Sequence, residues 1–385
     1  MWPDLSYIIH SITGVPPDNV FSVVKTFGLF LGLAFVSSAY LTYLELKRKE
    51  NRGILQGMEE KIVIYKPLQL TDIIIQTVIQ FVVFAKFIYI LQNGSEFIKD
   101  PASVLFSLKA APEGALVVAI LYAVYLFYKK SKQTESEIKY QTLFIHPKDR
   151  IFDITTIAAL YGIIGSKLFS ILENLESFIK DPIGEFFSGS GLTIYGGLIL
   201  AFIMVYRFVS QKGLKPLHVM DAVAPALMMG YCVGRMGCHF SGDGDWGIVN
   251  ELAKPSWFIF PDSWWAYNYA HNVLNEGLRI EDCSWNYCYQ LFPAVFPTPL
   301  YEVILAGFIT GVLWLLRTQI HRAGVLFFIY CLLNGLERFF IEFLRVNPRY
   351  TLLQYELSQA QIIAMLLMVG GIGGIYYFWK KNIPN

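Results

Sequence analysis

The chain alternates long apolar runs with shorter polar connections. A helix that crosses a membrane needs about 20 apolar residues, because each residue rises about 1.5 Å along an axis that must span about 30 Å of hydrocarbon. Runs of this length fall near residues 20–43, 73–93, 112–129, 151–171, 191–209, 219–239, 298–316, 323–344 and 359–379. The pattern therefore predicts an all-α, polytopic integral membrane protein with about nine transmembrane helices.

Basic residues are unevenly distributed among the connections. They crowd the first connection, from Lys47 to Lys66, and the third, from Lys129 to Arg150, while the even-numbered connections hold few. Connections rich in Lys and Arg stay in the cytoplasm. We therefore expect a periplasmic N-terminus, a cytoplasmic C-terminus, and an outer position for 240–297, the longest connection. The first twenty residues contain no Lys or Arg, so we expect the first apolar run to remain as a helix and not to be a cleaved signal peptide.

Composition agrees with a membrane protein. Apolar residues make up 55% of the 385 residues and charged residues only 16%, which is unlike a soluble globule. The formal net charge of +1 gives no global basic field, and no Lys/Arg-rich tail is present, so we exclude nucleic acid as a partner. We expect no cofactor.

The connection 240–297 is rich in Trp and Tyr. Such rings favour the headgroup level of a membrane, but they would equally suit the core of a small folded cap, and the sequence leaves both interpretations open. Cys283 and Cys288 lie in the same connection. A local disulfide is favoured over a metal site, because the predicted compartment is oxidising and no histidines stand at ligand spacing. We expect no metal site.

Titratable side chains gather where the apolar run 219–239 ends: Arg235, His239, Asp243 and Asp245. A charged side chain within a spanning segment costs roughly 2.5–3.5 kcal/mol, so it tends to persist where it faces a polar cavity, a partner or a ligand. The letters of 242–245 also match the Gly-x-Gly-Asp pattern of intramembrane aspartyl proteases. Such enzymes share a proton between two aspartates within the membrane, whereas these aspartates lie beyond the helix end. Calcium is disfavoured because it takes 6–8 oxygens.

A polar stripe runs along the predicted helix 323–344. Asn334, Arg338, Glu342 and Arg345 recur at helical spacing, and Glu337 flanks them. Arg338 and Arg235 lie near the outer ends of their helices, and two arginines that converge in a low-dielectric site suggest a phosphate, the anion that suits a planar bidentate donor. The alternative is an Arg338/Glu342 pair that only holds helices together.

Two further stretches lie at the same predicted level. Gly196 and Gly197 permit the close approach of a lipid headgroup or of a neighbouring helix, and Tyr195 could donate a hydrogen bond there. Close helix packing explains the glycines equally well. Tyr301 and Glu302 open the run 298–316, where Glu302 adds a carboxylate; an interfacial anchor is the alternative.

With these residues in view, the chain resembles the prolipoprotein diacylglyceryl transferases of bacteria. The resemblance covers roughly 20–45 and 151–380 and rests on the order of several motifs. They are Phe27-Gly28-Leu29, Gly196-Gly197-Leu198, Asp221 to Pro225 followed by Gly234-Arg235-Met236-Gly237, Leu300-Tyr301-Glu302, and Arg338 with Glu342, Phe343 and Arg345. The resemblance implies a seven-helix core in a single membrane domain, 1–385, into which 66–130 is inserted as a helical pair.

The resemblance also implies a reaction. The diacylglyceryl group of a phospholipid, usually phosphatidylglycerol, would pass to the thiol of the lipobox cysteine in a signal-peptide-bearing preprolipoprotein, in the first step of lipoprotein maturation at the bacterial cytoplasmic (inner) membrane. Arg235 and Arg338 would stabilise negative charge on the departing phosphate ester. By position, the catalytic set is Arg235, Arg338, Asp243, Asp245, His239 and Glu342, and the substrate-binding set is Tyr195, Gly196, Gly197, Cys238, Gly247, Tyr301, Glu302 and Asn334.

The chain departs from the family pattern where protons would move. Tyr195 replaces the family's histidine before the two glycines, Cys238 replaces its asparagine, and Asn334 replaces its tyrosine one turn before the second arginine. The stretch 241–245 stands in place of Asn-Gly-Glu and is one residue longer. The thiol must be deprotonated, since the thiolate is the reactive form. The base is therefore open among His239, Asp243 and Asp245, and we favour an aspartate.

Two other classes of function compete with the enzyme. A divergent relative could bind lipid or an exported protein without chemistry, as an assembly or secretion partner. This alternative predicts that Arg235, Arg338 and the Asp243/Asp245 pair are scattered and do not meet around one cavity. A small-molecule transporter predicts an internal repeat with helices broken near the midplane. We expect no such repeat.

Overall fold

The computed structural model describes residues 1–133, 137–187, 193–352 and 355–381. Within these ranges, eight helices are long and apolar enough to cross a membrane. They are α2 (Thr26–Asn51), α3 (Leu70–Gln92), α6 (Pro112–Ser131), α7 (Ile151–Glu173), α10 (Ile194–Gln211), α11 (Pro216–Ser241), α13 (Thr298–Leu316) and α15 (Gln359–Lys380). The remaining predicted run, 323–344, forms a shorter helix, α14 (Val325–Ile341), which ends in the 3-10 turn η3 (Glu342–Leu344). The prediction of an all-α polytopic membrane protein is confirmed.

Short elements connect these helices. The helical ones are α1 (Leu5–Thr13), η1 (Val20–Val23), α4 (Gly94–Lys99), α5 (Pro101–Phe106), η2 (Pro147–Arg150), α8 (Leu175–Lys180), α9 (Pro182–Phe187) and α12 (Asp262–Trp265). The strands pair as three antiparallel hairpins: β1 (Met58–Tyr65) with β2 (Lys139–Ile145), β3 (Leu278–Arg279) with β4 (Tyr289–Gln290), and β5 (Arg349–Leu352) with β6 (Tyr355–Ser358). The sequence pattern did not predict α1, because nine residues are too few to span a membrane.

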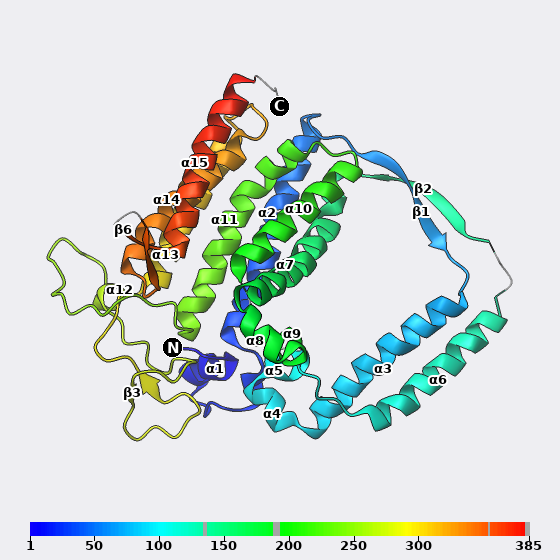
Figure 1. The fold of residues 1–385 in the computed structure, drawn as a ribbon, viewed down its shortest axis with the longest axis horizontal. Coiled ribbons are helices and arrows are strands. Elements are labelled where there is room, and N and C mark those ends of the chain that lie inside the picture. The colour runs from blue at the N-terminus through cyan, green and yellow to red at the C-terminus, as the bar shows by residue number, and fades with distance from the viewer. Residues whose placement is uncertain (134–136, 188–192, 353–354, 382–385) are drawn as a thin grey trace. The chain divides into compact units, whose positions relative to one another are not determined.

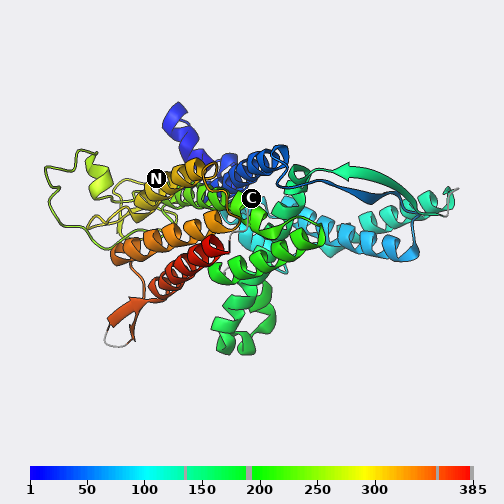
Figure 2. The same cartoon turned by 90° about the horizontal axis from the view of Figure 1, so that it is seen from above.

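The chain divides into two compact units. The first contains Met1–Gln56, Pro147–Thr155 and Tyr206–Asn385, and the second contains Gly57–His146 and Thr156–Val205. In the first unit, α11 packs against α2 and α13, and α14 packs against α15. Helices α14 and α15 lie side by side in both Figure 1 and Figure 2.

Small residues on α11 let its neighbours approach closely. A Cβ atom on Gly237 would lie 2.9 Å from the Phe30 side chain of α2, so only glycine permits this contact. The apolar core of the first unit forms where α11, α13 and α14 meet, and it includes Ala224, Met228, Ala306, Leu313 and Leu326. At the start of α14, the buried carboxylate of Asp221 accepts hydrogen bonds from the backbone N–H groups of Gly324 (2.7 Å) and Phe327 (3.0 Å). These contacts fix the beginning of the helix that carries the polar stripe.

The connection 240–297 has a small core of its own. Trp246, Tyr269, Leu291 and Val295 are buried together, as expected for a folded cap. Trp257 nevertheless remains 72% exposed, so part of the connection also presents aromatic surface. A disulfide joins Cys283 to Cys288, with 5.6 Å between the two Cα atoms.

The second unit contains two similar hairpins, a repeat that the sequence analysis did not predict. The stretch Phe97–Pro101 recurs letter for letter at Phe178–Pro182. In each copy a helix of 23 residues, α3 or α7, leads into two helices of six residues, α4–α5 or α8–α9. The repeat is hard to see in the sequence because most side chains of the long helices have diverged while the lengths of the elements have not. No sequence pattern of broken helices accompanies it.

Candidate active site

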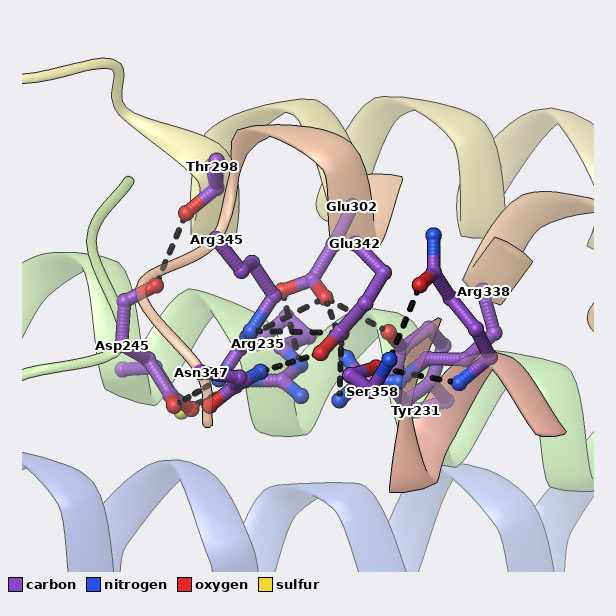
Figure 3. Close-up of polar contacts among 12 residues, drawn as sticks. Tyr231, Arg235, Asp245, Thr298, Glu302, Arg338, Glu342, Arg345, Asn347 and Ser358 are labelled. Atoms are coloured by element: carbon purple, nitrogen blue, oxygen red, sulfur yellow. Dashed lines mark hydrogen bonds and ion pairs between the residues drawn. The ribbon is translucent and has the colours of Figure 1, made fainter. Parts of the chain in front are cut away.

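The site is built around Glu302, near the start of α13. Glu302 is fully buried. Its carboxylate forms ion pairs with Arg235 Nε of α11, at 3.0 Å, and with Arg338 Nη1 of α14, at 3.1 Å (Figure 3). The Tyr231 hydroxyl, one turn before Arg235, donates to the same carboxylate at 3.1 Å. A single buried carboxylate on α13 therefore binds groups from two other helices, α11 and α14.

Arg345 is the third arginine of the cluster. It follows η3, and its Nη1 lies 3.3 Å from Glu302 Oε1. Figure 3 shows Arg235 and Arg345 beside Asp245, and both guanidinium groups form ion pairs with that carboxylate. Asp245 is the exposed member of this group: 32% of its side chain is accessible, against 10% for Arg235 and 9% for Arg345. The cluster thus opens to its surroundings at Asp245.

The backbone around Asp245 is fixed on both sides. Thr298 Oγ1 donates to the Asp245 carbonyl at 2.8 Å. Gly247 pairs with Arg345 as an isolated β-bridge, and a Cβ atom at Gly247 would lie 2.5 Å from the carbonyl oxygen of Leu344, so a larger residue does not fit. These contacts therefore hold the backbone of the loop in place. If Asp245 moves, its side chain must rotate while the backbone stays fixed.

Glu342 completes the set of ion pairs. Its Oε2 lies 3.2 Å from Arg338 Nη2, and Asn347 donates a hydrogen bond to its Oε1. The Arg338/Glu342 pair is the one that the sequence offered as a purely structural alternative. Because Arg338 also binds Glu302, the pair is part of the larger cluster and not an isolated link between turns of one helix.

Charges in the cluster are balanced. Three guanidinium groups, those of Arg235, Arg338 and Arg345, face three paired carboxylates, those of Glu302, Glu342 and Asp245. Glu337 lies next to this set on α14 and is 5% exposed, and within the described part of the chain neither of its carboxylate oxygens has a hydrogen-bond partner. An anion that enters must therefore replace a carboxylate, since the arginines carry no spare charge.

Asp243 and Cys238 lie beside the exposed end of the cluster. Burial, and then the negative charge of Asp245, raises the pKa of Asp243 above its usual value. Burial also acts to raise the pKa of Asp245, but Arg235 and Arg345 outweigh it, so that pKa lies below its usual value. Two neighbouring carboxylates with opposite shifts are a common basis for dividing acid and base roles.

The same residues are a poor metal site. Ligand atoms of Cys238, Asp243 and Asp245 lie within 4.8 Å of one another. However, Arg235 Nη1 lies 3.8 Å from Cys238 Sγ and forms an ion pair with Asp245. A fixed guanidinium at this point repels a cation, so the arrangement suits proton transfer better than metal binding.

Other predicted residues lie apart from the ion pairs. His239 Nδ1 is 3.2 Å from the Tyr269 hydroxyl, in the aromatic core of the cap. The Tyr301 hydroxyl donates to the Trp264 carbonyl at 2.7 Å, and Asn334 donates to the Tyr330 hydroxyl at 3.1 Å. These contacts give each residue a structural role and leave the predicted substrate contacts untested.

The glycine pair belongs to the second unit. A Cβ atom on Gly196 would lie 2.6 Å from the Gly165 carbonyl oxygen, and one on Gly197 would lie 2.7 Å from the Gly162 carbonyl oxygen. The two glycines therefore permit contact between α10 and α7, as the packing alternative proposed. Tyr195 precedes them in α10, and its proposed contact with substrate stays a prediction.

Two members of the cluster were missing from the predicted site. Tyr231 stands four residues before Arg235, a spacing that places both on one face of α11. Arg345 was recognised as part of the polar stripe but was not assigned a role at the site. Helical spacing could have suggested both residues, but their common partner, Glu302, lies on another helix.

Comparison with known proteins relates the chain to a bacterial group. A family model described as prolipoprotein diacylglyceryl transferase matches residues 113–377. Curated relatives carry the name phosphatidylglycerol–prolipoprotein diacylglyceryl transferase. One from Clostridium tetani is 28% identical over 269 residues, which are 70% of this chain and 93% of the relative. One from Clostridium novyi is 28% identical over 284 residues (73% and 95%), and one from Lysinibacillus sphaericus is 29% identical over 247 residues (62% and 80%).

Proposed function

The chain belongs to the prolipoprotein diacylglyceryl transferase family, and we propose that its charged cluster carries out the transfer. The protein is a transferase of bacterial lipoprotein biosynthesis that moves the diacylglyceryl group of phosphatidylglycerol to a prolipoprotein, and it is a multi-pass membrane protein. The acceptor is the thiol of the lipobox cysteine in a signal-peptide-bearing preprolipoprotein. The observation that carries this proposal is the convergence of Arg235, Arg338 and Arg345 on one buried carboxylate.

The chemistry requires stabilisation of a growing anion. The cysteine thiolate attacks the glycerol carbon that bears the phosphate, a carbon–sulfur bond forms, the carbon–oxygen bond to phosphate breaks, and glycerol phosphate leaves with the electron pair. Negative charge therefore increases on the phosphate oxygens. Fixed guanidinium groups in a buried site stabilise such charge strongly, because they need no reorganisation as the reaction proceeds.

The lipid phosphate takes the place of the Asp245 carboxylate. Asp245 is the accessible partner of Arg235 and Arg345, whereas Glu302 and Glu342 are buried. Rotation of one side chain would free two guanidinium groups without moving the backbone, which Thr298 and Gly247 hold. Glu302 would stay in place and keep the arginines aligned.

Asp243 is the base that we assign to the thiol proton. It lies next to the position that the phosphate would occupy, and its raised pKa makes it a better proton acceptor than an ordinary carboxylate. Glu342 positions Arg338, and Cys238 and Asp245 flank Asp243. His239 is less suited to this role, because its ring contacts the Tyr269 hydroxyl in the cap.

We place the charged cluster on the periplasmic side. The basic connections support this orientation, with a periplasmic N-terminus and a cytoplasmic C-terminus. In the first unit the cluster adjoins the connection 240–297, which carries the disulfide expected of an oxidising compartment. The cap would then meet the acceptor protein at the outer surface of the inner membrane.

Transfer in detergent tests the function. Purified full-length protein is mixed with phosphatidylglycerol and a lipobox peptide, and the lipidated peptide is measured by mass spectrometry. We expect product with the cysteine peptide and none with a peptide that carries serine at that position. Folded protein that yields no product from phosphatidylglycerol or phosphatidylethanolamine would contradict the proposal and would favour the non-catalytic relative.

A further inference from the structure

The two hairpins of the second unit correspond residue by residue. The Ala111 N–H donates to the Ala85 carbonyl at 3.0 Å, and the Thr193 N–H donates to the Ser166 carbonyl at 3.1 Å. The Asn93 side chain donates to the Tyr89 carbonyl at 3.0 Å, and the Asn174 side chain donates to the Ser170 carbonyl at 3.1 Å. In each copy the aspartate of the shared Phe-Ile-Lys-Asp-Pro stretch accepts from a backbone N–H three residues later, Ser103 at 3.0 Å and Gly184 at 2.9 Å. The extra spans α3 and α6 are therefore a duplicate of α7 and α10.

The copies differ in how their long helices meet. Gly162 and Gly165 of α7 contact Gly196 and Gly197 of α10 through the backbone. In the first copy, Gly114 meets Ile88 as Gly196 meets Phe169, so these positions correspond. The α7 glycines correspond by register to Phe81 and Phe84, and Gly197 corresponds to Ala115. At these positions α3 and α6 therefore carry side chains where α7 and α10 have none.

A polar cavity lies between α3 and α6 at the end next to β1. Its volume is about 600 Å³. The residues that carry polar groups into it include Lys66, Asp72, Gln76, Tyr122, Lys129 and Gln133. By register, the residues that correspond to Gln76 and Lys66 in the second copy are Ile157 and Pro147, which carry no such groups. The second copy therefore lacks the polar groups that Gln76 and Lys66 contribute in the first.

Most of the polar groups of the cavity that the structure describes are paired with one another or with the backbone. Lys66 forms an ion pair with Asp72 at 2.9 Å, and the Tyr122 hydroxyl donates to Gln76 at 3.3 Å. The Gln133 side chain accepts from the Leu68 N–H at 3.0 Å. Lys129 has no ion-pair partner among the residues that the structure describes, so the lining carries a net positive charge.

We propose that this cavity binds the phosphate headgroup of an anionic phospholipid. Lys129 supplies the positive charge, and Tyr122 and Gln76 supply neutral hydrogen-bonding groups. The exposed apolar side chains of α3 and α6 can contact the acyl chains. The cavity lies where α6 ends in Lys129 and Lys130 and where Lys66 precedes the start of α3, and such clusters of lysines at the end of a spanning helix are typical of headgroup binding. The duplicated hairpin thus gives the protein a lipid site separate from the arginine cluster, and this site does not depend on the transfer reaction.

Photolabelling of the full-length protein tests the site. The protein is placed in nanodiscs that contain phosphatidylglycerol with a diazirine next to the headgroup, irradiated, and mapped by mass spectrometry. We expect labelling within 112–131. Lys129→Gln should reduce it about tenfold, as expected for loss of one charge-assisted hydrogen bond, and Gln76→Ile should reduce it as well. Lys130→Gln is the matched control, because Lys130 is an exposed neighbour that does not line the cavity.

The outcomes separate the possible ligands. Strong labelling that falls in Lys129→Gln and persists in Lys130→Gln supports the proposal, as does weak labelling by an analogous phosphatidylcholine probe. Equal labelling in both variants would overturn it. Inorganic phosphate that displaces the lipid probe at millimolar concentration would assign the cavity to free phosphate and overturn the lipid assignment. Since no step requires turnover, failure here is distinct from failure of the transferase assay.

Discussion

Two regions of the first unit bury charge, and they do so differently. Where α2 ends, Glu45 is fully buried and forms ion pairs with Arg48 and with Arg317, the latter at 2.7 Å. Arg48 also donates to the Arg317 carbonyl at 3.0 Å, and the Arg317 guanidinium stacks on Trp314. Both partners of Glu45 therefore lie near helix ends, Arg48 near the end of α2 and Arg317 at the end of α13. At the active-site cluster, by contrast, Asp245 is accessible and Glu337 has no hydrogen-bond partner among the described residues.

The difference shows what distinguishes a site from a clamp. Both regions contain arginines paired with a buried glutamate, so charge within an apolar protein does not by itself identify function. A closed network has no partner that a ligand can replace. The cluster around Glu302 has one, Asp245, and it has a protonatable neighbour, Asp243, beside it.

The largest effect on transfer is expected at Arg338. Arg338→Ala should lower the transfer rate by about 10²–10³, because it removes a partner from Glu302 and Glu342 and so disturbs the alignment of the two guanidinium groups that bind the phosphate. Arg338→Lys should recover little, because an ammonium cannot bind Glu302 and Glu342 together as the guanidinium fork does. The rate of lipidated peptide formation measures both. A rate in Arg338→Ala within about threefold of the wild type would show that the cluster is a clamp like the one at Glu45.

Asp243→Asn should come next, with a loss of about 10² in rate, as expected for a general base. Because burial raises the pKa of Asp243, wild-type transfer should increase with pH through a limb that lies above the usual carboxylate range, as the base loses its proton. The pH profile of the rate measures this limb. A limb that persists unchanged in Asp243→Asn would assign the proton to another group.

A smaller effect is expected at Asp245, where a substitution should strengthen the binding of glycerol phosphate. Asp245→Asn keeps the shape of the side chain and removes the charge that competes with the phosphate for Arg235 and Arg345. Glycerol phosphate should therefore inhibit this variant several-fold more strongly than the wild type, since less charge must be displaced. Inhibition constants from the peptide assay give the comparison. Weaker inhibition would mean that Asp245 positions the arginines and is not displaced.

The smallest effect on transfer is expected at the closed network. Glu45→Gln should leave the rate per folded molecule within about twofold, yet it should destabilise the protein by about 3 kcal/mol, because it leaves two half-buried arginines without their carboxylate partner. Thermal unfolding in detergent measures the stability. Loss of transfer in Glu45→Gln protein that unfolds at the wild-type temperature would contradict the distinction between the two regions.

Much of the fold and part of the site could be predicted from local patterns. The lengths of the apolar runs predicted the spanning helices. Helical spacing predicted the polar stripe that includes Arg338 and Glu342. The motif order placed Arg235 and Glu302 at one level, and the structure joins them at 3.0 Å. These features are local because one helix turn sets them.

The rest depends on contacts between distant segments. No spacing rule shows that Asp245 pairs with Arg345, because the two residues approach each other only through the bridge at Gly247. The division of the arginines among three carboxylates is likewise a property of packing. The duplication of α7 and α10 was missed because Gly165 and Phe84 look unrelated until the two hairpins are compared in register.

The most direct test of the arginine cluster is one rate measured in three proteins. Wild type, Arg235→Ala and Arg317→Ala are purified in detergent, shown to be folded, and assayed for diacylglyceryl transfer from phosphatidylglycerol to a lipobox peptide. Both substitutions remove an arginine that pairs with a buried glutamate. We predict that Arg317→Ala transfers at a rate close to that of the wild type and that Arg235→Ala loses at least about 10² in rate. Equal rates in the two variants would contradict the assignment of catalysis to the cluster around Glu302.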